Sequence, residues 1–459
     1  MTPCPTANRI IVSLRPSRRP GGAVVTTVLT YISERVFRLA LAAIVGVFVA
    51  RYLGPERLGL LSFAGGTFGL LTPLTALGLP SLLVREFSTK DEWRPFLASA
   101  LAIQVPVALF AAVVGMAVVI VARDFARDAV LLAVVLAPLP FLTTHLTLRS
   151  YFEATGGVRR IAVTGMVAGV VGAGWRLSGL GASAPVWFFG AAGSIEAAAL
   201  LVGLALGVPG RRRVAALRRH FRRNVARRLL DESWPLLLAA VAVTIYMKSD
   251  LLMLGLIAGD EETGLYTAAA RLSEVWYFIP IAAAAAIRPR LARMFAARRE
   301  QRYLAATQRF MTALVGVAVL AAALVLLAAD LIIQFLYGTD FSPAGPVLRV
   351  HVLAAPFVFL GVAGSQWFID RGLTQAVMRR STVGAVLNVV LNLALIPSQG
   401  AMGASIATLT AYAVSGVLLN GVTRQTRPLF GLQVRSFVLR WPTMYPPEGE
   451  QSETTGTED

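Results

Sequence analysis

Charged residues are scarce in this sequence: Asp, Glu, Lys and Arg make up only 15% of its 459 residues. Soluble globular proteins contain about 25% charged residues. The hydrophobic fraction is 56%, and segments 95–122 and 129–148 carry no charge at all. Each is long enough to cross the hydrocarbon core of a bilayer, which takes about 20 helical residues. Because lipid cannot satisfy free backbone polar groups, these segments must be helical, and a soluble fold is excluded.

Cysteine and histidine are scarce too. The single cysteine, Cys4, excludes a disulfide framework and a cysteine-based metal site. The three histidines, His145, His220 and His351, are too dispersed for a metal cluster. The sequence also lacks a D-x-D motif and any Ser/His/Asp or Cys/His arrangement. We therefore expect no metal, no cofactor and no catalytic residue, and the sequence does not predict an enzyme.

Twelve membrane-spanning helices are predicted from the apolar segments. They lie at 29–50, 59–84, 95–122, 129–148, 161–180, 184–208, 234–258, 264–287, 310–336, 347–370, 381–398 and 402–421. With a cytoplasmic N-terminus, 33 of the 43 Lys and Arg residues fall on the inner side and five in outer connections. The positive-inside rule therefore predicts an inner-membrane protein with both termini cytoplasmic. The net charge of +18 follows from this topology, and nucleic acid is not expected as a partner.

An internal repeat divides the chain. The turn Gly54–Gly59 follows the first span, and a similar turn with an acidic residue, Gly259–Gly264, follows the seventh. Parallel halves of six spans are common in transporters, with the substrate path between them. The predicted parts are a cytoplasmic leader (1–28), an N-lobe (29–208), an Arg-rich cytoplasmic linker (209–233), a C-lobe (234–422) and a largely disordered cytoplasmic tail (423–459).

The linker carries nine arginines between Arg211 and Glu232. Two interpretations remain open for it. It forms an amphipathic helix on anionic membrane lipids, where each Arg contributes about 1 kcal/mol, or it only sets the topology and joins the two halves.

Five stretches resemble a known family. They are Arg51–Pro55 with Gly59–Ser62, Leu77–Glu86, Lys248–Ala269, Leu336–Gly338 with Phe341–Ala344, and Leu395–Thr408. In these stretches the chain resembles the Wzx-type polysaccharide biosynthesis flippases of the multidrug/oligosaccharidyl-lipid/polysaccharide exporter superfamily. The resemblance implies an all-α membrane fold of two six-helix lobes arranged as a V, as in MATE transporters. It also implies transport of a lipid-diphosphate-linked oligosaccharide, on an undecaprenyl or dolichyl carrier, for a surface polysaccharide such as the O-antigen of lipopolysaccharide. The expected protein partners are a polysaccharide polymerase and glycosyltransferases.

Ten charged residues fall within the predicted spans. They are Glu34, Arg35, Arg38, Arg176, Glu196, Lys248, Asp250, Arg271, Glu274 and Asp330. A charge in the middle of a bilayer costs about 2.5–3.5 kcal/mol, so each one marks a candidate functional position. Helical spacing predicts a Glu34–Arg38 pair. The hairpin of spans seven and eight allows Asp250 to pair with Arg271 and Lys248 with Glu274.

We assign these charges to two roles. The predicted substrate-binding residues are Arg35, Arg38, Arg176, Lys248 and Arg271, because guanidinium groups suit a diphosphate. The predicted residues for a coupling H⁺ or Na⁺ are Glu34, Glu196, Asp250 and Glu274. A purely structural role, in which the pairs make insertion tolerable, remains an alternative. Asp330 and His351 are expected to be structural, near the outer rim. The equal numbers of acids and bases weigh against a strongly cationic cavity.

Three other functions remain as alternatives. A multidrug exporter and a peptidoglycan-precursor flippase belong to the same superfamily. A membrane-embedded glycosyltransferase or polymerase fits less well, because its chemistry calls for a substantial outer loop and the predicted outer connections are short.

Overall fold

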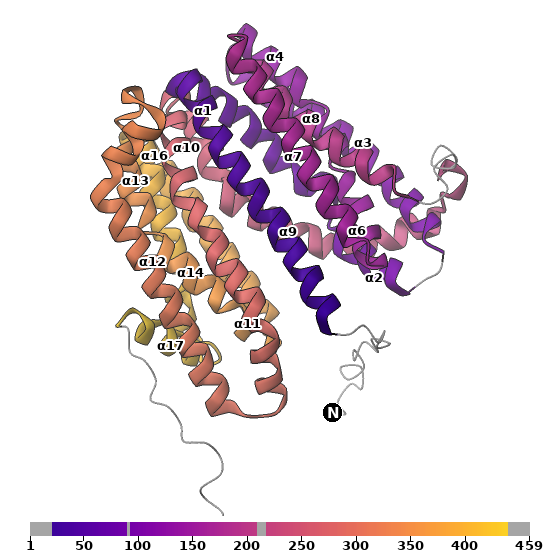
Figure 1. Cartoon of the computed structure of the whole chain (residues 1–459), viewed down its shortest axis with the longest axis vertical. Coiled ribbons are helices and arrows are strands. Elements are labelled where there is room, and N and C mark those ends of the chain that lie inside the picture. The colour runs from indigo at the N-terminus through magenta and orange to yellow at the C-terminus, as the bar shows by residue number, and fades with distance from the viewer. Residues whose placement is uncertain (1–20, 90–91, 209–216, 439–459) are drawn as a thin grey trace, which may run out of the picture.

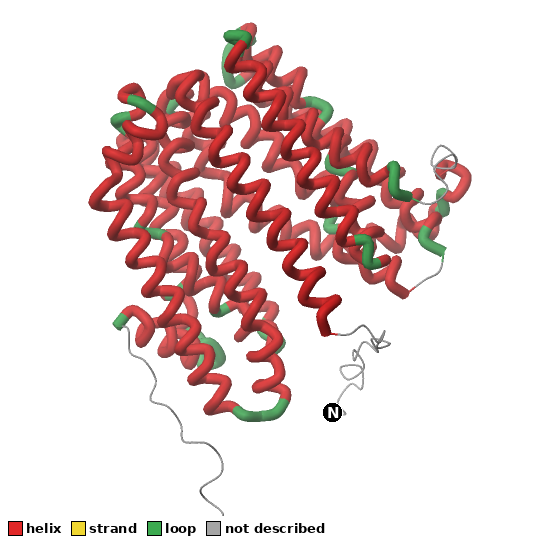
Figure 2. Tube along the Cα trace, in the orientation of Figure 1, coloured by secondary structure: helices red, strands yellow, loops and turns green. Residues whose placement is uncertain are grey.

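Helices account for nearly all of the fold. A computed structural model describes residues 21–89, 92–208 and 217–438, and these residues contain no strand (Figure 2). The helices of the N-terminal half are α1 (Gly21–Ala76), α2 (Leu79–Thr89), α3 (Arg94–Val121), α4 (Arg127–Leu136), α5 (Leu139–Leu142), α6 (His145–Thr155), α7 (Val158–Gly181) and α8 (Val186–Ala205).

The C-terminal half contains nine α-helices within the described residues. They are α9 (Arg223–Ile257), α10 (Asp260–Glu274), α11 (Phe278–Ala296), α12 (Glu300–Tyr337), α13 (Ala344–Val352), α14 (Ala355–Ala363), α15 (Ser365–Asp370), α16 (Thr374–Gly416) and α17 (Arg427–Phe437). Short 3₁₀ helices are η2 (Leu217–His220), η3 (Val275–Tyr277), η4 (Thr339–Phe341) and η5 (Leu418–Gly421).

The twelve predicted crossings are accounted for by the described residues. Nine stretches there are long and apolar enough to cross a membrane, and α9, bent by 52° near residue 246, makes a tenth. Two of the ten, containing α1 and α16, break at glycines with non-helical angles, Gly54 and Gly400. As one rod, the 56 residues of α1 would be about 84 Å long, far more than a bilayer needs. Because the chain turns back at Gly54 and at Gly400, two of the ten stretches cross twice, which gives twelve crossings.

The two halves form a V. Figure 1 shows the halves touching at one end and splaying apart toward the end that carries the first described residues. We call the first of these the closed end and the second the open end. Each half has an apolar core of its own, and a further core at the closed end contains Leu58 of the N-terminal half together with Leu254 and Tyr266 of the C-terminal half. The predicted all-α fold of two six-helix lobes is thereby confirmed.

The two repeat turns meet at the closed end. A Cβ on Gly59 would lie 1.7 Å from the backbone oxygen of Asp260, and a Cβ on Gly264 would lie 1.9 Å from that of Pro55. Asp260 and Gly264 are the positions that the repeat pairs with Pro55 and Gly59, each 205 residues earlier. The same contact is therefore made twice, with the roles of the halves exchanged, as around a two-fold axis. Only glycine at both positions permits this backbone approach.

Helix α9 joins the two halves. At the open end Arg228 contacts Glu86 of α2 at 3.1 Å, and Glu232 pairs with Arg85. Toward the closed end the same helix packs against α10 and α16. Residues 223–232 of the predicted linker are thus the first turns of α9, and residues 209–216 lie outside the described residues.

The predicted tail differs from the expectation of a largely disordered segment. Helix α17 forms within it because its apolar residues, including Leu429 and Leu432, fall on one face and are buried against the C-terminal core. Its Ser436 hydroxyl also accepts a hydrogen bond from the side-chain amide of Gln308 of α12 at 2.8 Å. Residues 1–20 of the leader and 439–459 of the tail lie outside the described residues.

Candidate functional site

All five charges predicted at membrane depth in the N-terminal half line one cavity. Its volume is about 350 Å³, and it is formed by the first crossing together with α6, α7 and α8. The residues lining it are Glu34, Arg35, Arg38, Leu39, Leu41, Ala42, Val45, Arg149, Gly169, Ala173, Arg176 and Glu196. Five predicted site residues are among them: Glu34, Arg35, Arg38, Arg176 and Glu196.

Arg38 is the centre of an ionic network in this cavity. Its Nη1 donates to Glu34 at 3.2 Å, which confirms the predicted pair one helical turn apart. Its Nη2 donates to Glu196 of α8 at 3.1 Å, a contact that the sequence did not reveal. The other oxygen of Glu196 lies 3.8 Å from Arg176 of α7. Two carboxylates thus hold two guanidinium groups that reach the cavity from different helices.

The cavity has an excess of positive charge. Four arginines line it, against two glutamates. The fourth, Arg149 of α6, was not predicted, because it followed the fourth span and was counted with the inner connections. It pairs with Glu153 at 2.8 Å. Arg35 is exposed, and no described residue forms an ion pair with it. The equal numbers of acids and bases over all spans therefore did not predict the excess of arginine in this one cavity.

Glycines of α7 make room for these charges. A Cβ on Gly165 would lie 2.3 Å from the carboxylate of Glu34, and one on Gly169 would lie 3.3 Å from Arg38. A Cβ on Gly172 would lie 3.1 Å from Glu196. The three glycines are spaced four and three residues apart, so they share one face of the helix. This spacing was visible in the sequence, but its meaning depends on which charged residues lie opposite.

The arrangement suits an anionic ligand. The Arg38 side chain is 32% exposed, and that of Arg176 is 27% exposed. A guanidinium has five N–H donors, and the carboxylates occupy only some of them. The remaining donors can bind phosphate oxygens in pairs, and the low-dielectric surroundings strengthen such contacts.

A second polar cluster lies in the C-terminal half around Asp250 of α9. Its buried carboxylate accepts hydrogen bonds from Tyr266, from Thr408 at 3.3 Å and from the N–H of Leu251 at 2.8 Å. His351, predicted near the outer rim, is buried beside Tyr266, with its Nε2 3.4 Å from the phenol oxygen. The carboxylate therefore has neutral partners.

Two amide side chains of α16 lie beside Ser249, the residue that precedes Asp250. Ser249 donates to Asn388 at 2.9 Å, and Asn392 donates to the same oxygen at 3.1 Å. Among the described residues there is no group of three or more His, Cys, Asp and Glu that could hold a metal ion. The Asp250 cluster thus offers one carboxylate with two hydroxyl groups.

The predicted ion pairs of the α9–α10 hairpin are corrected by the structure. Asp250 does not pair with Arg271, because Tyr266 occupies its oxygens and Arg271 lies five residues further along α10, about 140° around the helix. Arg271 instead approaches the first crossing, with its Nη1 3.5 Å from the position of a Cβ on Gly46. No salt bridge within the described ranges joins Lys248 to Glu274, whose charges interact at longer range.

The remaining intramembrane acid lies apart from both sites. Asp330 of α12 pairs with Arg349 of α13 at 2.5 Å, and its side chain is half exposed. This contact fits the structural role expected for Asp330.

The fold and the buried charges define a multi-pass membrane protein with the architecture of a two-lobe transporter. A solved structure of lipid II flippase MurJ in an inward closed conformation is similar, with a TM-score of 0.66 and 14% identity over 90% of this chain and 91% of that one. An inward-facing MATE-family multidrug resistance transporter of the MOP superfamily is similar with a TM-score of 0.65 and 16% identity, over 88% of this chain and 95% of that one.

The family follows from the sequence match. The model of the family described as polysaccharide biosynthesis protein matches residues 24–295, more than half of the chain, and the chain belongs to this family. The MatE family model matches residues 235–394. A probable low-salt glycan biosynthesis flippase, Agl15 of Haloferax volcanii, is 25% identical over 197 residues, which are 42% of this chain and 41% of that protein. The match thus spans less than half of that relative's length.

Proposed function

We propose that this protein is a flippase that moves a lipid-diphosphate-linked oligosaccharide from the cytoplasmic to the outer leaflet for surface polysaccharide assembly. The observation that carries the proposal is the cavity in the N-terminal half, where four arginines face two glutamates. The family match and the relative described as a probable glycan biosynthesis flippase support it.

The cationic cavity binds the diphosphate. Arg38 and Arg176 are held in place by Glu196, and Arg35 and Arg149 add two further guanidinium groups to the cavity wall. The lipid tail stays in the bilayer while the sugar occupies the space between the halves. Lys248 and Arg271 belong to the C-terminal half and contribute when the halves rock around the substrate, as in alternating access.

Asp250 is the first candidate for the coupling ion, H⁺ or Na⁺. It is buried, has no cationic partner within salt-bridge distance among the described residues, and lies between the hydroxyl groups of Tyr266 and Thr408. Glu34, Glu196 and Glu274 remain candidates, but the first two are engaged by arginines. We expect Asp250→Asn to remove the dependence of transport on the ion gradient. Unchanged stimulation by both Na⁺ and H⁺ gradients in that variant would exclude Asp250.

The protein is proposed to make and break no covalent bond. Its transport step lies between two enzymatic steps of polysaccharide assembly. Glycosyltransferases supply the lipid-linked oligosaccharide at the cytoplasmic face, and a polymerase consumes it outside. The proposed location is the inner membrane with both termini cytoplasmic.

Export of a multidrug substrate or of a peptidoglycan precursor is the competing function. The two solved structures represent these two functions with almost equal TM-scores, so the fold does not choose between them. The excess of arginine favours a phosphorylated substrate over the cationic drugs that an acidic cavity would select.

Complementation separates these functions. The gene is expressed in three strains, which lack an O-antigen-type flippase, the peptidoglycan-precursor flippase or the main drug exporters. We expect restored surface polysaccharide in the first strain and no gain in drug resistance. Rescue of the second or third strain without the first would reject the proposal.

A further inference from the structure

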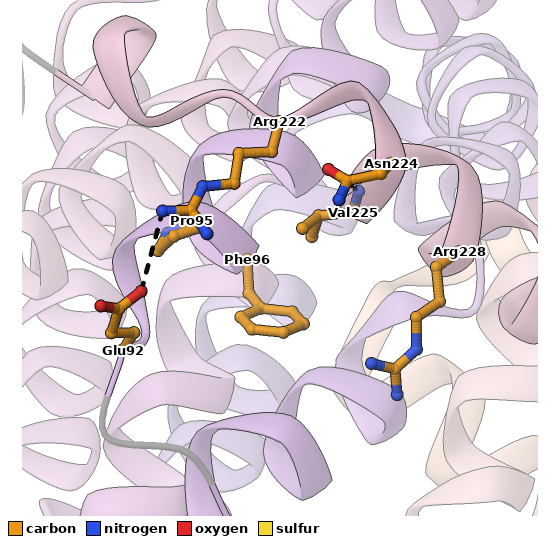
Figure 3. A pocket seen from close by; sticks show the side chains of 7 residues that line it. All are labelled: Glu92, Pro95, Phe96, Arg222, Asn224, Val225 and Arg228. Carbon is orange, nitrogen blue, oxygen red and sulfur yellow. Dashed lines mark hydrogen bonds and ion pairs between the residues drawn. The ribbon is translucent and has the colours of Figure 1, made fainter.

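A second cavity lies at the open end, away from the proposed transport cavity. It has a volume of about 320 Å³ and lies where α3 begins beside the start of α9. The residues lining it are Glu92, Pro95, Phe96, Arg222, Asn224, Val225 and Arg228. In Figure 3 the Arg222 and Arg228 side chains flank the Phe96 ring from two sides. The cavity thus combines an apolar floor with a cationic rim.

This cavity lies at the level of the membrane interface. Helix α3 starts at Arg94, and the charge-free segment 95–122 follows at once. Trp93 precedes the segment, with the Arg94 guanidinium 5.5 Å from its ring centroid. Tryptophan and arginine beside the end of an apolar helix mark the headgroup region of a bilayer. At this depth a bilayer places its lipid phosphates next to acyl chains, which can contact the part of the Phe96 ring that lines the cavity.

The rim has hydrogen-bond donors to spare. The Arg222 side chain is 59% exposed, and its ion pair with Glu92 is long, at 3.9 Å. Glu92 is itself 76% exposed and free to turn away from an incoming anion. Arg228 holds Glu86 at 3.1 Å and Glu232 at 2.7 Å, which fixes its position at the cavity edge.

Asn224 and the start of α9 add to this surface. Asn224 accepts from the Val225 N–H at 2.9 Å through Oδ1, which leaves its amide N–H groups as donors. The N-terminal end of a long helix favours a negative charge nearby. Arginine, amide and helix dipole thus point to the same ligand chemistry.

We infer that this cavity is a binding site for the phosphodiester of an anionic membrane phospholipid. The phosphate binds between Arg222 and Arg228, and an acyl chain lies over Phe96 and Val225. The lipid then fastens the first turn of α9 to α3. This site is independent of the transported substrate, and it binds lipid whether or not the proposed function is correct.

Lipid binding to the purified full-length protein tests the inference. Native mass spectrometry in detergent counts bound dioleoyl-phosphatidylglycerol during a titration, with dioleoyl-phosphatidylcholine and inorganic phosphate as parallel ligands. We expect saturable binding of phosphatidylglycerol and an increase of about tenfold in its Kd in Arg222→Gln, because one charge-assisted contact is lost.

Arg227→Gln is the matched control. Arg227 lies in the first turns of α9, five residues after Arg222, has an ion pair of the same length, 3.9 Å to Asp231, and does not line the cavity. Its Kd should match that of the unmodified protein. If Arg222→Gln and Arg227→Gln weaken phosphatidylglycerol binding equally, the effect comes from the general surface charge, and the site is rejected. Competition by millimolar inorganic phosphate, with no preference for the lipid, would reject the phospholipid as its occupant.

Discussion

Arg38 holds two carboxylates from different helices, and this geometry decides how it can be tested. Its contacts to Glu34 and Glu196 use both terminal nitrogens. A lysine keeps the charge but cannot make two directed contacts and still offer a donor edge to phosphate. Arg38 therefore serves as both a structural and a substrate-binding residue in the proposed function.

We expect Arg38→Lys to retain part of the surface polysaccharide in a complemented strain and Arg38→Ala to retain none, with normal amounts of protein in the membrane. The double variant Glu34→Gln with Arg38→Gln separates the two roles. It should remain inactive, since the diphosphate contact is still missing. Restored polysaccharide in the double variant would show that Arg38 only neutralises Glu34.

Gly165 provides a residue-scale test of how the cavity is packed. A Cβ there would meet the Glu34 carboxylate at 2.3 Å, so Gly165→Ala should displace Glu34 and destabilise the protein by about 1–3 kcal/mol. Gly174 is the matched control on the same helix, because nothing lies within 4 Å of its Cβ position. Gly174→Ala should be stabilising by about 0.5–1 kcal/mol. Thermal unfolding in detergent measures both, and equal effects would contradict the described packing of α7 on the first crossing.

Among elements, the repeat turns matter most. Each places a positive-φ glycine at its start, Gly54 at 73° and Gly259 at 88°, and each sets a second glycine against the other turn's backbone. This contact between the two turns requires the two halves to touch at the closed end. Arg123 reinforces it by donating to the Asp260 carboxylate at 2.9 Å and to the Gly255 carbonyl at 2.9 Å. The closed end is therefore a joint built by both halves.

We expect Gly59→Ala to push the two turns apart, because its Cβ would occupy the space of the Asp260 carbonyl. Spin labels at Glu56→Cys and Glu261→Cys, in a Cys4→Ser background, report the separation by pulsed electron paramagnetic resonance. Longer distances are expected for Gly59→Ala than for Gly65→Ala, a control with nothing within 4 Å of its Cβ position. Identical distance distributions would show that the turns are not a close-packed joint.

Sequence patterns predicted the elements better than their contacts. The twelve crossings and the repeat follow from apolar length and glycine spacing, which are local properties. The Glu34–Arg38 pair is local too, since both residues lie on one helix face. The Arg38–Glu196 contact and the Asp250–Tyr266 bond depend on which helices become neighbours and how each is rotated. The hairpin of spans seven and eight alone therefore suggested the wrong partner for Asp250.

At the scale of the whole molecule, two halves joined at one end and separated at the other suit alternating access (Figure 1). The proposed transport cavity belongs to the N-terminal half and the Asp250 cluster to the C-terminal half. Helix α9 contacts both halves, so a change around Asp250 can reach the open end through a single helix. In the proposed function, the diphosphate cavity and the first candidate for the coupling ion therefore lie in different lobes.

The distribution of Lys and Arg predicts how the whole molecule is oriented in the membrane. With both termini cytoplasmic, reporter fusions at Arg223 and Thr263 should report the inside and the outside respectively. Arg223 begins α9 and Thr263 lies just beyond its other end, so the two residues are one crossing apart. Both reporters on one side would contradict the single crossing between them, and the reversed order would place the open end outside.

Transport in reconstituted vesicles tests the central claim most directly. Purified protein is placed in liposomes with a labelled lipid-diphosphate-linked oligosaccharide, and an impermeant glycosidase measures how much of the label reaches the outer leaflet. The account predicts rapid loss of protection with the unmodified protein, and at least about tenfold slower loss with Arg38→Ala, since a lost charge-assisted contact costs on the order of 1.5–3 kcal/mol. Protection equal to that of protein-free liposomes, or equal rates for the two proteins, would contradict it.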